Sequence, residues 1–127
     1  LSGRIPYEFG NLQSLAVLWL SFNNLSGQLP ASMGNLTTYT YLNMVNSQIT
    51  GSIPKEIGNL VDLITLNLYG NQISGSIPAT FGNMISLRYM SMFDNQISGP
   101  LPPEFGNLTD MIYLSRINNS QLVGPYR

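Results

Sequence analysis

The chain has 127 residues, of which 43% are hydrophobic and only 9% charged, so it has ample apolar material for a core while its polar surface depends on uncharged side chains. It contains neither cysteine nor histidine, which excludes disulfides, thiolate or imidazole metal ligands, a thiol nucleophile and a Ser-His-Asp triad. The formal net charge of −1 gives no electrostatic reason to expect nucleic acid as a partner, and we expect no cofactor or metal.

One pattern recurs along the whole chain with a period of 24 residues. A Gly-Asn pair, a proline and a second glycine each return at this spacing. The Gly-Asn pairs begin at Gly10, Gly34, Gly58, Gly82 and Gly106, the prolines are Pro6, Pro30, Pro54, Pro78 and Pro102, and the other glycines are Gly3, Gly27, Gly51, Gly75 and Gly99. We therefore predict a single domain of repeats at residues 1–24, 25–48, 49–72, 73–96 and 97–121, with the start of a sixth.

Within a unit the elements are predicted in chain order from local chemistry. Apolar and polar residues alternate at the end of the stretch 63–68, which predicts a short strand whose leucines Leu66 and Leu68 point into a core. Asn71 follows at a turn, where its side-chain amide suits main-chain groups that lack partners. Residues 74–78 are expected to be extended, because the residue before a proline avoids the helical region. Residues 79–83 leave room only for a short 3₁₀ turn.

These units resemble leucine-rich repeats of the plant type. The pattern LxxLxLxxNxL occupies residues 63–73, and the segment from Ser52-Ile53-Pro54 to Gly58-Asn59-Leu60 matches the motif SGxIPxxxGNL, apart from the residue before Gly51. The resemblance implies an α/β leucine-rich repeat solenoid: a right-handed superhelix with a short parallel β-sheet on its concave face and 3₁₀ or irregular turns on its convex face. Because one unit cannot bury enough apolar surface alone, the units are expected to stack.

Such repeats are typical of the extracellular domains of plant receptor-like kinases, which serve signalling and defence. The resemblance therefore implies a non-catalytic, extracellular segment that binds a peptide, a co-receptor ectodomain or a microbial enzyme, and that reaches a membrane only through a longer parent chain. Two alternatives stay open: a secreted inhibitor of a cell-wall-degrading enzyme such as polygalacturonase, and an ice-binding repeat protein. Neither end of the sequence carries a recognisable cap, so we expect a fragment.

Outward-pointing strand residues form a grid on the concave face of such a solenoid, and seven of the thirteen aromatic residues fall on it. Tyrosine and tryptophan dominate binding hot spots, although aromatic side chains on neighbouring strands also stabilise sheets. The candidate ligand-binding residues are Trp19, Phe22, Tyr41, Asn43, Asn67, Tyr69, Tyr89, Ser91, Phe93, Asp94 and Tyr113. The amides and hydroxyls among them are expected to hydrogen-bond an extended peptide or a sugar.

Four N-glycosylation sequons and one column of acids complete the candidates. The sequon asparagines are Asn24, Asn35, Asn107 and Asn118. The acids Glu8, Glu56 and Glu104 recur two units apart, at neighbour distances of about 10 Å on a lateral or convex side, which predicts a solvated row rather than a catalytic pair.

Three positions depart from the pattern. Ser47 stands where other units have asparagine, and Tyr39 takes the place of a core leucine, where its hydroxyl is expected to need a partner or a route to water. Placing Arg116 outside the core requires one inserted residue between Leu114 and Ile117, which we interpret as a strand bulge.

Overall fold

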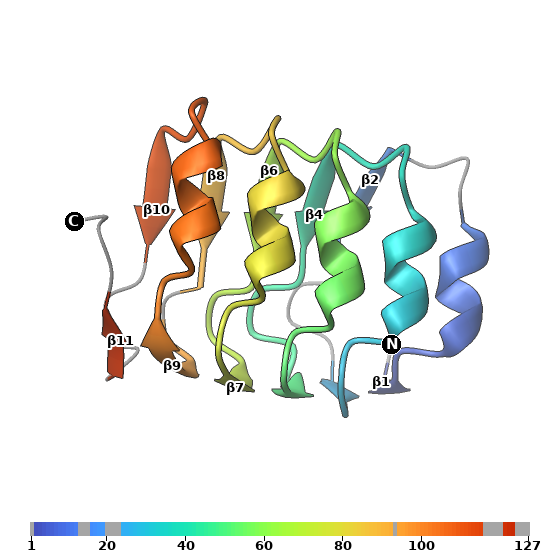
Figure 1. Cartoon of the computed structure of the whole chain (residues 1–127). Coiled ribbons are helices and arrows are strands. Elements are labelled where there is room, and N and C mark those ends of the chain that lie inside the picture. The colour runs from blue at the N-terminus through green and yellow to red at the C-terminus, as the bar shows by residue number, and fades with distance from the viewer. Residues whose placement is uncertain (1, 13–15, 20–23, 93, 116–120, 124–127) are drawn as a thin grey trace.

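The computed structural model describes residues 2–12, 16–19, 24–92, 94–115 and 121–123, which form a stack of similar coils (Figure 1). Each coil contributes one strand to a parallel five-stranded sheet in the order β10-β8-β6-β4-β2, here called the inner sheet. Its strands are β2 (Val17–Trp19), β4 (Tyr41–Asn43), β6 (Thr65–Asn67), β8 (Tyr89–Ser91) and β10 (Tyr113–Ser115). The predicted leucine-rich repeat fold is confirmed.

A second row of short parallel strands runs along the lower edge of the stack in Figure 1. These strands are β1 (Ser2–Arg4), β3 (Asn24–Ser26), β5 (Thr50–Gly51), β7 (Gln72–Gly75), β9 (Gln96–Pro100) and β11 (Gln121–Val123). The sequence predicted extended segments here but not that they pair. β1 pairs with β3, and β5, β7, β9 and β11 form a separate four-stranded sheet.

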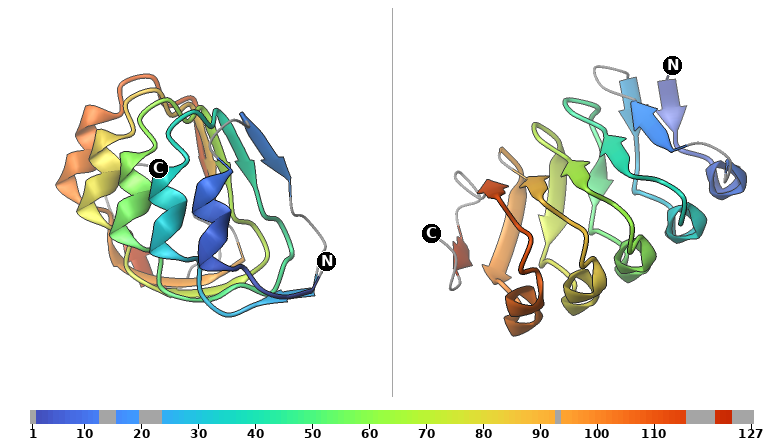
Figure 2. Two further views of the ribbon diagram at one scale, coloured as in Figure 1. Left: turned by 90° about the vertical axis from the view of Figure 1, so that its right-hand side faces the viewer. Right: turned by 90° about the horizontal axis from the view of Figure 1, so that it is seen from above.

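In the described ranges, five 3₁₀ turns lie opposite the inner sheet, as the two views of Figure 2 show. They are η1 (Tyr7–Asn11), η2 (Ala31–Asn35), η3 (Lys55–Asn59), η4 (Ala79–Asn83) and η5 (Pro103–Asn107). Each is preceded by an extended proline whose carbonyl accepts the first i→i+3 hydrogen bond, such as that from Phe81 N–H to Pro78 at 3.1 Å. The expected 3₁₀ turn at 79–83 is confirmed.

The core lies between the inner sheet and the 3₁₀ turns. Leu66 and Leu68 are buried as predicted, at 1% and 0% exposed. Close stacking of the turns explains one repeated glycine: a Cβ added to Gly34 would lie 2.5 Å from the carbonyl oxygen of Glu56 in the next coil. The equivalent Gly106 has nothing within 4 Å of such a Cβ.

Asn71 joins two coils through its buried side chain, as its position in a turn predicted. Its Oδ1 accepts hydrogen bonds from the backbone N–H groups of Ser47 (2.9 Å) and Ile49 (3.1 Å). Its Nδ2 donates to the carbonyls of Met44 (2.8 Å) and Leu68 (2.9 Å). Four main-chain groups that water cannot reach are thereby satisfied by one amide.

Tyr39 does not behave as expected. Its side chain is 0% exposed, and its hydroxyl has neither a hydrogen-bond partner nor contact with solvent. The ring occupies the position that Leu63 and Leu87 fill in other coils, where those leucines are also buried. This burial raises the pKa of the Tyr39 hydroxyl above its ordinary value, because the charged form loses its hydration.

Strand pairing near the end of the described chain agrees with one inserted residue. In the second row, partners are offset by 22 residues where β5 meets β7 (Thr50 with Gln72) but by 23 where β9 meets β11 (Ser98 with Gln121). In the inner sheet, Ser115 still pairs with Ser91 at the regular offset of 24. The extra residue therefore falls between Ser115 and Gln121, and the predicted bulge itself lies outside the described residues.

Candidate functional site

The inner sheet arranges the predicted grid in register. Its first column is Val17, Tyr41, Thr65, Tyr89 and Tyr113, each residue paired with the next across the parallel strands. Its second column is Trp19, Asn43, Asn67, Ser91 and Ser115. Because successive side chains of a strand point to opposite faces, the column residues of β2, β4, β6 and β8 lie opposite the buried side chains of Leu18, Leu42, Leu66 and Met90.

Three apolar side chains of this face are strongly exposed: Trp19 at 65%, Val17 at 54% and Tyr89 at 44%. Tyr41 and Tyr69 are half-buried. The core does not use these groups, since the residue between each pair of grid positions is the one that points inward, as Leu18 does in β2. The result is a face with large apolar side chains and few charges.

An aromatic pair stands at the β2–β4 end of the grid. The ring centroids of Trp19 and Tyr41 are 6.0 Å apart and the planes are tilted by 40°. The Asn43 Nδ2 donates a hydrogen bond of 3.0 Å to the Tyr41 hydroxyl, and the Asn43 Oδ1 accepts one of 3.2 Å from the Val45 N–H. The Tyr41 ring is thus oriented by its own strand.

These contacts correct the role expected for Asn43. We predicted that its amide hydrogen-bonds a ligand, but the side chain is only 6% exposed and both ends of the amide are engaged within the coil. Asn67 is half-buried, and its Oδ1 accepts a hydrogen bond of 3.2 Å from the Tyr69 N–H. Ser91, also half-buried, keeps its place on the grid.

Asp94 is the exposed acid expected beside the grid, and it adopts a left-handed backbone conformation with φ 59°. Its counterparts Asn46 (φ 55°) and Gly70 (φ 74°) share that conformation. A Cβ at Gly70 would overlap the Asn46 Oδ1, so the glycine leaves room for the asparagine amide. This left-handed column forms one border of the inner sheet.

Some candidate binding and glycosylation residues lie outside the described residues, and others are described by their backbones alone. Phe22, Phe93 and the sequon residue Asn118 fall outside the described residues. Tyr113 and Asn24 are placed by their backbones in β10 and β3. The sequon residues Asn35 and Asn107 are exposed at the ends of η2 and η5.

The acidic side chains form no recognisable catalytic or metal site in the described part of the chain. Glu8 and Glu104 are exposed and Glu56 is half-buried, each in the first turn of its 3₁₀ element, as expected for a lateral row. No group of three or more metal-ligating side chains occurs among the described residues. Within the same ranges, no helix has the length and hydropathy required to cross a bilayer.

Sequence reasoning missed a cavity beside the second row, bordered by Arg4, Gln28 and Thr50. One feature of the sequence does distinguish this region. The residue after the regularly spaced glycine has a long polar side chain in the first two units, at Arg4 and Gln28, but is a serine in the next two, at Ser52 and Ser76.

Comparison with known proteins identifies the repeat family and several similar structures. Residues 14–36, 40–60, 62–84 and 86–108 match the family model described as Leucine Rich Repeat. No relative among curated protein sequences matched. The chain is similar to the plant peptide hormone receptor RGFR1, solved in complex with RGF2, at 32% identity and a TM-score of 0.87 over 97% of this chain and 19% of that one.

Two Arabidopsis receptor kinases are also similar. The leucine-rich repeat ectodomain of SOBIR1 from Arabidopsis thaliana shows 27% identity and a TM-score of 0.89 over 100% of this chain and 68% of that one. HAESA, in complex with the peptide hormone IDA and the co-receptor SERK1, shows 32% identity and a TM-score of 0.86 over 98% of this chain and 20% of that one. The chain thus spans about a fifth of the length of the hormone-bound receptors. It belongs to the leucine-rich repeat family and resembles the ectodomains of plant membrane receptor kinases, whose fold is typically non-catalytic.

Proposed function

We propose that this chain is part of an extracellular receptor surface that binds a peptide or a partner ectodomain on the inner sheet, without chemistry. The observation that carries the proposal is the exposure of Trp19, Val17 and Tyr89 on a face that the core does not need. Large aromatic side chains offer contact area at low cost in rotamer entropy and dominate binding hot spots. Similar chains have been solved with peptide hormones and with the co-receptor SERK1, which supports the same class of ligand here.

Prior orientation of the aromatic rings favours binding. The Asn43 amide holds the Tyr41 hydroxyl at 3.0 Å, and the Trp19 ring lies against Tyr41. Side chains that are already fixed lose less conformational entropy when a ligand docks on them. We therefore assign Trp19 and Tyr41 as one anchor and Tyr89 as a second, two strands along the sheet. Tyr69, Asn67, Ser91 and Asp94 line the surface between and beside them.

Binding is tested by selecting a displayed library of random 12-residue peptides against the immobilised domain. We expect wild-type protein to enrich peptides, and the double variant Trp19→Ala/Tyr89→Ala to lose them while its circular dichroism is unchanged. Tyr7→Ala is the matched control, because Tyr7 is 69% exposed on the 3₁₀ turn η1 rather than on the inner sheet. Equal enrichment by the double variant and the control would contradict binding on this face.

The two alternatives are separated by direct assays. An inhibitor would slow a purified polygalacturonase, and an ice-binding protein would produce thermal hysteresis. Ice binding requires a flat, regular array of small polar groups, and the protruding side chains of Trp19 and Tyr89 disfavour it.

We further propose that the exposed sequons at Asn35 and Asn107 carry glycans. Both asparagines end 3₁₀ turns, and the threonines two residues later, Thr37 and Thr109, are also exposed. Glycans at these positions would leave the inner sheet free for a ligand. The sequons at Asn24 and Asn118 remain candidates on the sequence alone.

A further inference from the structure

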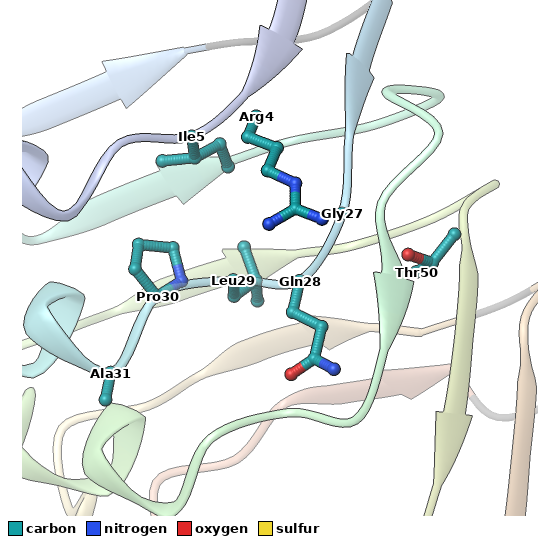
Figure 3. A pocket seen from close by; sticks show the side chains of 8 residues that line it. All are labelled: Arg4, Ile5, Gly27, Gln28, Leu29, Pro30, Ala31 and Thr50. Carbon is teal, nitrogen blue, oxygen red and sulfur yellow. The ribbon is translucent and has the colours of Figure 1, made fainter.

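A cavity of about 490 Å³ lies beside the second row of strands, and no inner-sheet residue lines it (Figure 3). Three successive coils each contribute one polar side chain to its border. Arg4 ends β1, Gln28 follows β3, and Thr50 begins β5. The cavity is therefore separate from the grid proposed to bind a peptide or ectodomain.

The second row is interrupted at this cavity. β3 and β5 belong to different sheets, and the hydrogen bond of 3.0 Å from the Thr50 N–H to the Gly27 carbonyl links them. Gln48 has φ 64°, whereas its counterparts Gln72 and Gln96 are the first residues of β7 and β9. A left-handed conformation is unfavourable for glutamine, and here it delays the start of β5 to Thr50. The chain thus departs from its own repeat where the cavity opens.

Glycine positions hold the long polar side chains at the border. The Arg4 Cγ lies 3.2 Å and its Nε 3.4 Å from the position that a Cβ on Gly27 would take. The stem of Gln28 covers Gly51 in the same way, and a Cβ there would overlap it. Both side chains are thus exposed to solvent with their stems against the backbone of the next coil.

The lining combines one permanent cation with an apolar floor. Arg4 is the single charged residue among the lining groups, and no carboxylate in the described ranges forms an ion pair with it. Ile5 and Leu29 are buried at 6% and 5% exposed, and Pro30 lies beside them. Figure 3 shows the Arg4 guanidinium on the same side of the cavity as Ile5, with the Thr50 side chain across the Gly27–Gln28 segment.

We propose that this cavity binds a small organic carboxylate with a branched apolar body. The Arg4 guanidinium supplies the binding group, since guanidinium groups pair with carboxylates through strong charge-assisted hydrogen bonds. The apolar part of the ligand packs against Ile5, Leu29 and Pro30. A phosphate or sulfate ion has no hydrocarbon group that could make this contact. The carboxylate belongs either to a free organic acid or to the C-terminus of a peptide that ends in an aliphatic residue.

The test is a titration of the ¹⁵N-labelled protein with N-acetylleucine, followed through the backbone amide signals of Gly27, Gln28 and Thr50. N-acetylleucinamide, which is neutral and of nearly equal shape, is the matched ligand. We expect saturable shifts with the acid and affinity at least about tenfold lower with the amide, since a hydrogen bond to a charged group is lost. Arg4→Gln lowers affinity for the acid similarly, whereas Arg88→Gln, at an exposed arginine outside the cavity, leaves it unchanged.

Equal shifts by acid and amide, unchanged affinity in Arg4→Gln, or no saturable shift at these residues would each overturn the proposal. A tetrapeptide, Gly-Gly-Ala-Leu with a free carboxylate, distinguishes the two sources. Binding about tenfold tighter than that of N-acetylleucine assigns the cavity to a peptide C-terminus, and equal binding assigns it to a free acid. None of these outcomes depends on whether the inner sheet binds a peptide.

Discussion

Replacing Asn71 with alanine tests whether single buried amides join the coils. The side chain makes four hydrogen bonds of 2.8–3.1 Å to main-chain groups of two coils, and it is 8% exposed. A net contribution of about 1 kcal/mol for each gives a loss of about 3–4 kcal/mol, because the alanine removes the amide partner of two buried N–H groups and of the Met44 carbonyl. The Leu68 carbonyl keeps its hydrogen bond of 2.8 Å from the Asn95 Nδ2. That loss is a large part of the roughly 5–15 kcal/mol by which folded domains are usually stable.

The measurement is urea unfolding followed by circular dichroism. Asn59→Ala is the matched control, because Asn59 is exposed at the end of η3 in the same unit, and we expect it to change the free energy of unfolding by less than about 0.5 kcal/mol. A loss below about 1 kcal/mol for Asn71→Ala, close to that of the control, would refute the reasoning.

Three further predictions concern stability and modification. Tyr39→Phe removes a buried hydroxyl without a partner, so we expect the free energy of unfolding to rise by about 1 kcal/mol in the same urea assay. Because burial raises the pKa of Tyr39 in the folded state, wild-type stability declines once the pH exceeds the unfolded value of about 10, and the advantage of Tyr39→Phe widens there; a constant difference across that range would contradict this. Gly34→Ala forces overlap with the next coil and costs about 1–3 kcal/mol, whereas Gly106→Ala, in open space, changes stability by less than about 1 kcal/mol; equal losses would argue against turn stacking as the reason for the glycine. After expression through a secretory pathway, mass spectrometry finds glycans on Asn35 and Asn107, and their absence would remove the modification proposed there.

Much of the fold could be predicted because each unit repeats the same local chemistry. Proline fixes an extended residue before each 3₁₀ turn, and alternation around Leu66 predicts which side chains are buried. The grid columns followed from the period alone, since parallel pairing in register places equivalent residues side by side. The binding role of that grid is a different matter: it depends on a ligand and stays a proposal.

The rest depended on which polar groups meet once the chain is folded. The sequence marks Asn43 as a surface amide, but the strand end beside it and the Tyr41 hydroxyl take up both of its ends. Tyr39 reads as a residue in need of a partner, and packing leaves its hydroxyl with none. Hydrogen-bond partners of this kind come from neighbouring coils or from turn geometry that a pattern does not specify.

The sequence by itself determined the repeat, the elements within each unit and the residues that fill the core, because period, proline and glycine act locally and identically in every copy. Only the tertiary structure decided where the contacts between neighbouring coils differ from one repeat to the next. The left-handed Gln48 interrupts the second row, and the stems of Arg4 and Gln28 lie on glycines of the next coil. A cavity arises from that arrangement because it needs three coils in contact, and no single unit contains it.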